Sequence, residues 1–163
     1  MTLMNFLVGL PVMLLCLVLQ TALTFWCVRH YVRQSVETQT ARGFWTGIRP
    51  LVVAMLAMMV CNLLQIGLWA ALFVVLGEFG ERHDAIYHSA VNFTSLGYGD
   101  IVMSKNWKLL GPLEAANGVM MLAMTAAAIM AILQHMIKVQ QDSLFASAEA
   151  VLRRVAARRD GAP

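Results

Sequence analysis

Three long stretches of this sequence contain no Asp, Glu, Lys or Arg, namely residues 1–28, 50–77 and 115–137. A helix needs about 20 predominantly apolar residues to cross the hydrocarbon core of a bilayer, so each stretch is long enough to span it. Charged residues make up only 13% of the chain, against roughly 25% in a soluble domain. The sequence therefore predicts an all-α membrane protein with three transmembrane helices, and it argues against a soluble enzyme.

The charges between these stretches predict how the chain is oriented. The loop over residues 29–49 carries four arginines and one acid, and the tail over residues 138–163 carries one lysine and four arginines. Residues 78–114 carry both signs. Because Lys and Arg concentrate in cytoplasmic loops, we expect the loop and the tail to be cytoplasmic. The N-terminus and residues 78–110 should then lie outside the cell membrane.

The basic tail is predicted to be helical, because it contains no Pro or Gly before Gly161. Its residues at spacings of four and three form a short heptad seam of the coiled-coil type: Ile137, Gln141, Leu144, Ala148, Val151 and Val155. A solvated amphipathic helix, a bundle of several tails and a helix lying on anionic lipid are all compatible with this pattern.

A fourth uncharged stretch, residues 85–99, is too short to span the bilayer as a helix and ends in Gly97-Tyr98-Gly99. Apolar segments of about 10–14 residues are more often buried or re-entrant. We expect a short helix over residues 85–94 that dips into the membrane, followed by a non-helical return over residues 95–100. Non-helical backbone at that depth is tolerated only where protein buries it or where it lines a water-filled path.

The return segment could present a row of backbone carbonyls to a cation. Its glycines allow alternate residues to adopt positive φ without a Cβ clash. The partly negative C-terminal end of the short helix would favour a cation nearby. One segment supplies only one wall of such a cage, so several copies of the chain around an axis would be needed.

Residues Thr94-Ser95-Leu96-Gly97-Tyr98-Gly99-Asp100 resemble the filter signature of the potassium channel pore family. The resemblance implies a homotetramer with a pore domain over residues 50–137, made of an outer helix (50–77), a pore helix (85–94), a filter (95–100) and an inner helix (111–137). The transmembrane helix over residues 1–28 has no counterpart in the minimal two-span pore of that family.

The resemblance also implies roles for the filter residues. The backbone carbonyls of Ser95, Leu96, Gly97 and Tyr98 would bind dehydrated potassium, as carbonyls do in that family's filter. The Ser95 hydroxyl would complete the innermost site, and Thr94, Gly99 and Asp100 would support the filter. Ser95 stands where the family usually has Thr, and Leu96 where Val or Ile is commoner.

The function implied by the resemblance is passive, selective conduction of potassium. A weakly selective monovalent cation channel is the alternative suggested by Ser95, and a non-conducting regulatory membrane subunit is the alternative suggested by the additional first helix. Expected partners are membrane lipid and further copies of the chain. We expect no enzymatic activity, no nucleic-acid partner, no small-molecule substrate and no cofactor, with potassium as the permeant ligand only.

Tyr87 lies thirteen residues before Asp100, a position where members of the resembled family often have a Trp that hydrogen-bonds the filter carboxylate. Tyrosine also carries a donor at its tip. We therefore predict that the Tyr87 hydroxyl donates to the Asp100 carboxylate and supports the filter. The alternative is that Tyr87 only anchors at the headgroup level, as interfacial tyrosines do.

The third span has a small residue, Gly118, about where the resembled family often places a hinge glycine; close helix packing is the alternative role. One face of this span is predicted to line the cavity, with Gly118, Leu122, Thr125, Ile129 and Leu133. On the second span, Asn62 and Gln65 lie one turn apart and are predicted to face a partner helix.

Two other groups of residues have simple interpretations. Cys16, Cys27 and Cys61 lie in apolar runs and are expected to pack as buried small residues. His83 and His88 are interpreted as solvated loop residues rather than as part of a metal site.

Overall fold

The computed structural model describes residues 2–37 and 44–160, and this part of the chain contains four helices and no strand. They are α1 (Thr2–Glu37), α2 (Phe44–Val75), α3 (Arg82–Phe93) and α4 (Leu110–Asp160). Three of them, α1, α2 and α4, contain segments that are long and apolar enough to cross a membrane. The predicted fold class, an all-helical chain with three spans and one short helix, is confirmed within these residues.

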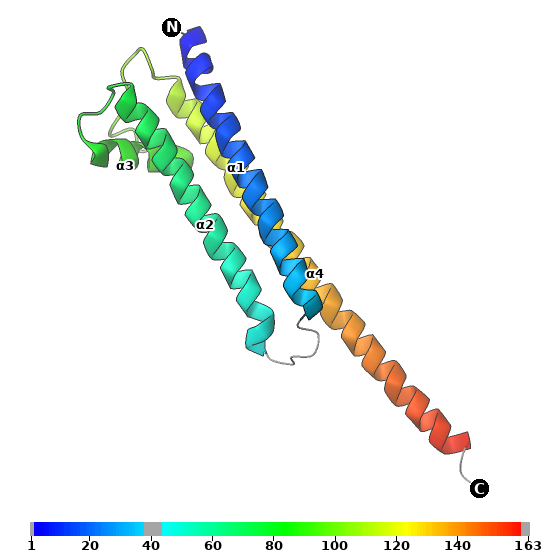
Figure 1. Ribbon diagram of the computed structural model, residues 1–163. Helices are drawn as coiled ribbons and strands as arrows, with labels where there is room; N and C mark the ends of the chain where they lie inside the picture. The colour runs from blue at the N-terminus through cyan, green and yellow to red at the C-terminus, as the bar shows by residue number, and fades with distance from the viewer. Residues whose placement is uncertain (1, 38–43, 161–163) are drawn as a thin grey trace.

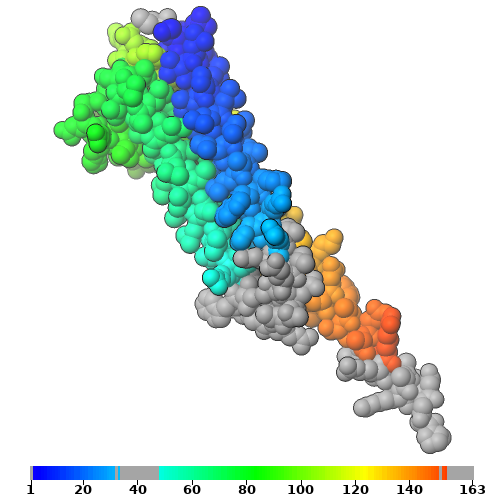
Figure 2. Space-filling view, viewed as in Figure 1, coloured from blue at the N-terminus to red at the C-terminus, as the bar shows by residue number. Residues whose placement is uncertain are grey.

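The three long helices lie side by side, and the short α3 crosses the bundle at one end (Figure 1). The N-terminus lies at the same end as α3, and the C-terminus lies far beyond the other end. The space-filling view shows a body that is widest around α3 and narrows to the single projecting helix of the tail (Figure 2).

Helices α1 and α2 extend into the charged loop that was predicted to separate them. The predicted basic loop over residues 29–49 is helical over residues 29–37 and 44–49, while residues 38–43 lie outside the described part. The tail is helical as predicted, and it continues the third span without a break to Asp160. Charged residues mark where a helix leaves the membrane, but they do not end it, because Arg and Lys are good helix formers.

The first helix packs along both α2 and α4. Its buried residues form two sets that repeat every eleven positions, with Asn5, Cys16 and Cys27 in one and Gly9, Gln20 and Tyr31 in the other. An eleven-residue repeat keeps one narrow face of a helix on its neighbours, with a slight right-handed drift. α1 is therefore part of the same helical body as the other two spans.

A polar cluster ties the three long helices together in the middle of the apolar layer. Gln65 Nε2 of α2 donates to Gln20 Oε1 of α1 at 2.9 Å. Gln20 Nε2 in turn donates to Thr125 Oγ1 of α4 at 2.9 Å, and Asn62 Nδ2 approaches the same oxygen at 3.3 Å. The prediction that Asn62 and Gln65 face a partner helix is confirmed. Interhelical bonds of this kind contribute about 0.6 kcal/mol each on average in a membrane.

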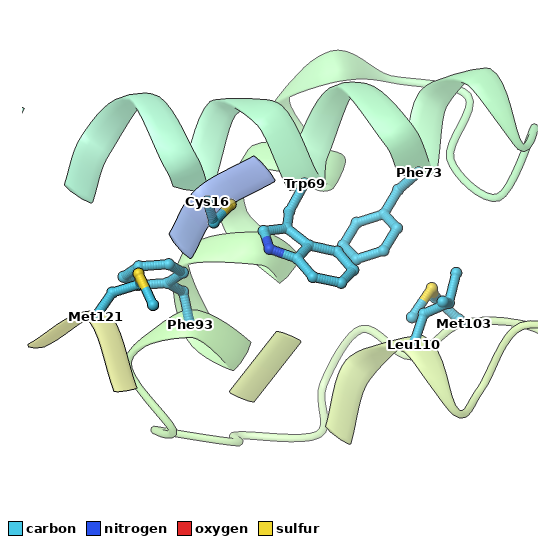
Figure 3. Close-up of a cluster of buried hydrophobic side chains, with 7 residues drawn as sticks. All are labelled: Cys16, Trp69, Phe73, Phe93, Met103, Leu110 and Met121. Carbon is cyan, nitrogen blue, oxygen red and sulfur yellow. The ribbon is translucent and has the colours of Figure 1, made fainter. Parts of the chain in front are cut away.

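An apolar cluster anchors α3 within the wide end of the molecule. Trp69 and Phe73 of α2, Phe93 of α3 and Met121 of α4 are all fully or almost fully buried in it. Figure 3 shows these side chains converging from three helices, with Cys16 of α1 beside them. The three cysteines are free and buried, as expected.

Gly118 permits an unusually close approach between α4 and the end of α3. A Cβ atom at this position would lie 1.9 Å from the Phe93 carbonyl oxygen and 2.7 Å from the Phe93 carbonyl carbon. Backbone atoms cannot swing aside as a flexible side chain can, so no larger residue fits here without moving a helix. Close packing, the alternative role considered for Gly118, is therefore present in the structure.

We expect Gly118→Ala to lower the free energy of unfolding of the protein by about 1–3 kcal/mol, as overpacking of a dense interior does. Gly67→Ala on α2 is the matched control, since nothing lies within 4 Å of a Cβ atom there. Both changes gain the same helix propensity. Thermal unfolding of the two purified variants in detergent would check this, and equal stabilities would contradict the contact.

Candidate functional site

The loop that follows α3 begins with a complete helix-ending motif. Leu96 N donates to Val91 O at 2.9 Å and Ser95 N donates to Asn92 O at 2.8 Å. The backbone of Ser95 itself is left-handed, with a φ of 58. This is the Schellman arrangement, in which a left-handed residue reverses the chain and satisfies the last carbonyls of a helix. The residue in that place is usually Gly, so Ser95 has a structural role that the sequence analysis did not identify.

Beyond this motif the backbone alternates in handedness. Ser95, Gly97 and Gly99 have φ values of 58, 59 and 73, and the intervening Leu96 and Tyr98 are not at positive φ. Such alternation turns successive peptide planes so that a short segment can direct its carbonyls to one side. The positive φ that the two glycines were expected to allow is present at both.

The whole segment from Thr94 to Asp100 is exposed in the single chain. Leu96 is 55% exposed and Tyr98 67% exposed, although both are large apolar or aromatic residues. Non-helical backbone at membrane depth needs protein or water around it. Because the single chain leaves this loop exposed, such protein or water would have to come from outside the chain.

Tyr87 on α3 bonds to the far end of the loop. Its hydroxyl donates to Asp100 Oδ2 at 2.8 Å, and the hydrogen bond predicted from the family resemblance is therefore confirmed. This bond raises the pKa of the Tyr87 phenol above its usual value, because the phenolate would face a carboxylate. The same bond lowers the pKa of Asp100, because the hydroxyl stabilises the charged form.

His88 makes a second tie between α3 and the residues after the loop. Its Nδ1 lies 2.9 Å from Ile101 O, and its Nε2 lies 2.8 Å from Asn92 Nδ2. Because a carbonyl only accepts, Nδ1 carries the hydrogen and Nε2 accepts from the amide. The ring packs against Phe73 and Phe79. Burial lowers the pKa of His88, which agrees with this neutral form.

The interpretation of His88 as a solvated loop residue was therefore wrong. The residue is only 6% exposed, since it belongs to α3 and faces α2 rather than water. No group of His, Cys, Asp and Glu side chains within residues 2–37 and 44–160 could hold a metal ion.

A third tie connects the loops on either side of α3. The Glu78 carboxylate accepts from Ser104 N at 2.6 Å through Oε2 and from Ser104 Oγ at 2.7 Å through Oε1. It therefore clamps the segment after the loop to the segment before α3. Hydrogen bonds to a charged acceptor are about twice as strong as neutral ones.

The residues predicted to line a cavity along α4 do not share one environment. Leu122 and Leu133 are exposed in the single chain, at 41% and 37%. Thr125 instead bonds Gln20 and Asn62 of the neighbouring helices, and Ile129 packs into an apolar cluster with them. Thr125 and Ile129 therefore face α1 and α2, and lining the cavity stays a prediction for the two leucines.

Three polar residues behind the loop were missed by the sequence analysis. Ser89 and Glu114 are completely buried, and Ser89 Oγ lies within hydrogen-bonding distance of Glu114 Oε1. Asn92 joins them beside His88. The inner helix predicted over residues 111–137 already contained Glu114, and the structure places it in the second turn of α4, but its complete burial was not predicted. The one signal in the sequence for this burial was that Glu114 lies between apolar residues.

Comparison with known proteins identifies the region that contains this loop. Residues 58–135 match a family model described as ion channel, and they run from within α2 through α3 and the loop into α4. No curated protein and no solved structure matches the chain. The matched region leaves out α1, which agrees with the expectation that the first helix is an addition to the pore domain.

We expect Tyr87→Phe to raise the pKa of Asp100 toward its ordinary value, because the ring stays and only the donor is lost. Asp100 would then take up its proton at a higher pH than in the wild-type protein. Carbon-13 NMR titration of the aspartate carboxyls in detergent would measure this. Tyr98→Phe is the control, since it leaves the bond in place, and an unchanged Asp100 titration in Tyr87→Phe would contradict its assigned cause.

Proposed function

We propose that this chain, whose residues 58–135 belong to the ion channel family, is a potassium-selective channel that conducts passively as a homotetramer. The observation that carries the proposal is the exposed loop after α3, in which Ser95, Gly97 and Gly99 alternate with residues of ordinary φ. Carbonyls of such a loop can replace the hydration shell of potassium. In this proposal the Ser95, Leu96, Gly97 and Tyr98 carbonyls supply the sites.

The exposure of the loop supports the assembly. One chain offers one row of carbonyls, while a cation without its water needs oxygens on all sides. Leu96 and Tyr98 would be covered by neighbouring copies in a closed ring, which is the usual form of homo-oligomers. Four copies are the number that the resemblance to potassium channel pores implies.

The local fields support a cation rather than an anion at this place. The C-terminal end of α3 leads directly into the loop, and the carbonyls at such an end carry a partial negative charge. The Asp100 carboxylate stands at the end of the loop, and its low pKa keeps it charged. Both features would raise the concentration of cations at the mouth of a pore.

Selectivity depends on how firmly the loop keeps its shape. Ser95 forms the left-handed turn that ends α3, and β-branched residues are disfavoured at positive φ. This offers a reason for Ser where the resembled family usually has Thr, so Ser95 need not mean weak selectivity. The ties through Tyr87, His88 and Glu78 hold the segments on both sides of the loop.

We further propose that the N-terminus and the loop face the outside of the cell and that the tail faces the cytoplasm. The N-terminus and α3 lie at the same end of the bundle (Figure 1), and the basic tail leaves the opposite end. Positive charges are retained on the cytoplasmic side.

In a background without native cysteines, a cysteine at Thr2 is expected to react with a membrane-impermeant thiol reagent in intact cells. A cysteine at Ser143 in the exposed tail should react only after the cells are opened. Mass shift on a gel would report both. The reverse pattern would place the loop on the cytoplasmic face and overturn the proposed orientation.

Purified protein in planar bilayers, with potassium chloride on one side and sodium chloride on the other, tests the proposed conduction. We expect the current to reverse far from zero, in the direction set by potassium flow. A reversal near zero would mean a weakly selective cation channel, and no current in any membrane would mean a non-conducting subunit.

Two glycine variants make this measurement specific to the loop. Gly97→Ala should abolish potassium preference or current, because Gly97 has φ 59 and a Cβ atom disfavours that conformation. Gly80→Ala is the control, since it has equal space but no positive φ. Equal currents in the two variants would mean that conduction does not depend on the conformation of the loop, and this would contradict the proposal.

A further inference from the structure

A buried carboxyl group lies between three helices directly behind the loop. Glu114 of α4 is completely buried, and so is its neighbour Ser89 of α3. Ser89 Oγ is within hydrogen-bonding distance of two oxygens, Ile66 O of α2 at 2.8 Å and Glu114 Oε1. The serine therefore stands between α2 and α4 at the centre of the short helix.

Counting hydrogens determines the state of this carboxyl. Ser89 has one hydroxyl hydrogen, and Ile66 O is a carbonyl that can only accept. If Ser89 donates to Ile66 O, the contact between Ser89 and Glu114 needs a hydrogen from the glutamic acid. If Ser89 donates to Glu114 instead, two oxygens lie 2.8 Å apart at Ile66 with no hydrogen between them.

The surroundings of Glu114 also favour the uncharged form. Its second oxygen, Oε2, is buried and has no hydrogen-bond partner, which is far more costly for a carboxylate than for a neutral acid. The groups that face it are Ser89 and Asn92 of α3, with the Cys16 thiol of α1 nearby. His88 reaches it only through Asn92 and is neutral, and α2 presents a backbone carbonyl. No cation forms an ion pair with it among the described residues.

We propose that Glu114 holds a proton and acts as a positioning residue, whose neutral carboxyl donates to Ser89 and fixes α4 to the short helix behind the loop. The hydrogen bonds then run in one direction, from Glu114 to Ser89 and from Ser89 to the Ile66 carbonyl. They join α4, α3 and α2 through a single oxygen. The link to the loop's shape rests on the proposed channel function, whereas the proton on Glu114 does not.

This arrangement makes the support of the loop depend on one proton. Ionisation of Glu114 would remove the donor to Ser89 and leave a bare negative charge in an apolar layer. Alkaline conditions should therefore loosen α3 from α4, while acid conditions should leave this contact intact. Glutamine can replace the protonated acid, because its amide has nearly the same shape and also offers a donor to Ser89 and an acceptor oxygen, with one further N–H.

Infrared difference spectroscopy of the full-length protein in lipid tests the proton directly. Subtracting the spectrum of Glu114→Gln from that of the wild type at pH 7 should reveal the carbonyl stretch of a protonated carboxylic acid. Glu149→Gln is the control, because the Glu149 carboxylate pairs with Arg153 on the exposed tail and should contribute no such band. Absence of the band from the Glu114 difference would overturn the proposal.

Stability and current then test the positioning role. Glu114→Gln should keep the thermal stability of the wild type and sustain its current up to alkaline pH, where the wild-type current falls. Glu114→Ala should lose stability at every pH and at least tenfold of the sustained current. If Gln destabilised the protein as much as Ala, the negative charge itself would be required and the proposal would be wrong. If the wild type carried no current, the infrared band and the two stabilities would still decide the matter.

Discussion

Every polar group of a backbone segment that enters a membrane must find a partner within protein or water, and in the proposed channel the loop after α3 has to meet this constraint. The turn at Ser95 closes the helix by returning two backbone N–H groups to its last carbonyls. Tyr87 and His88 then bond residues beyond the loop, at Asp100 and Ile101. The entry and the exit of the loop are thus both held by α3, and the segment between them is left open for contacts outside the chain.

The same constraint explains why α3 is held so tightly by its neighbours. It meets α2 through Ser89 and the Phe73 ring, and it meets α4 through Glu114 and the bare backbone at Gly118. A short helix has little stability of its own in isolation, so its position depends on these contacts. The conformation of the loop consequently depends on how the long helices pack around α3.

The first helix takes part in this packing, although it lies outside the region that matches the ion channel family. Gln20 bonds Thr125 on α4, and Gln65 on α2 bonds Gln20. A shift of α1 along its axis would therefore have to break bonds to both α2 and α4. Its contribution is to the relative position of α2 and α4 rather than to the loop itself.

Much of the fold was predictable because the membrane imposes simple rules on sequence. Runs without charge located the three spans, and the Gly97-Tyr98-Gly99 triplet located the loop. The Tyr87–Asp100 bond was predicted from the resemblance to potassium channel pores, in which a donor often stands thirteen residues before the filter aspartate. These signals are local in the sequence, so they can be recognised without knowing how the rest of the chain packs.

Other features depended on tertiary contacts that no local pattern records. A charge count treats Glu114 as the edge of a span, although burial between helices makes it part of the interior. Helical periodicity groups Thr125 with Leu122 on one face, but it cannot predict that Gln20 of α1 hydrogen-bonds to Thr125. His88 lies inside the helix predicted over residues 85–94, but no local pattern shows that its ring faces Phe73 of α2 rather than water.

The length of α4 has a mechanical consequence. The helix has 51 residues and contains neither Gly nor Pro after Gly118, so it is a stiff rod of about 76 Å at 1.5 Å per residue. Pivoting this rod by about 5° around the Gly118 contact would displace its far end, some 63 Å away, by about 5 Å. The far end can therefore act as the long arm of a lever, on which a small force produces a large torque at the Gly118 contact beside the loop.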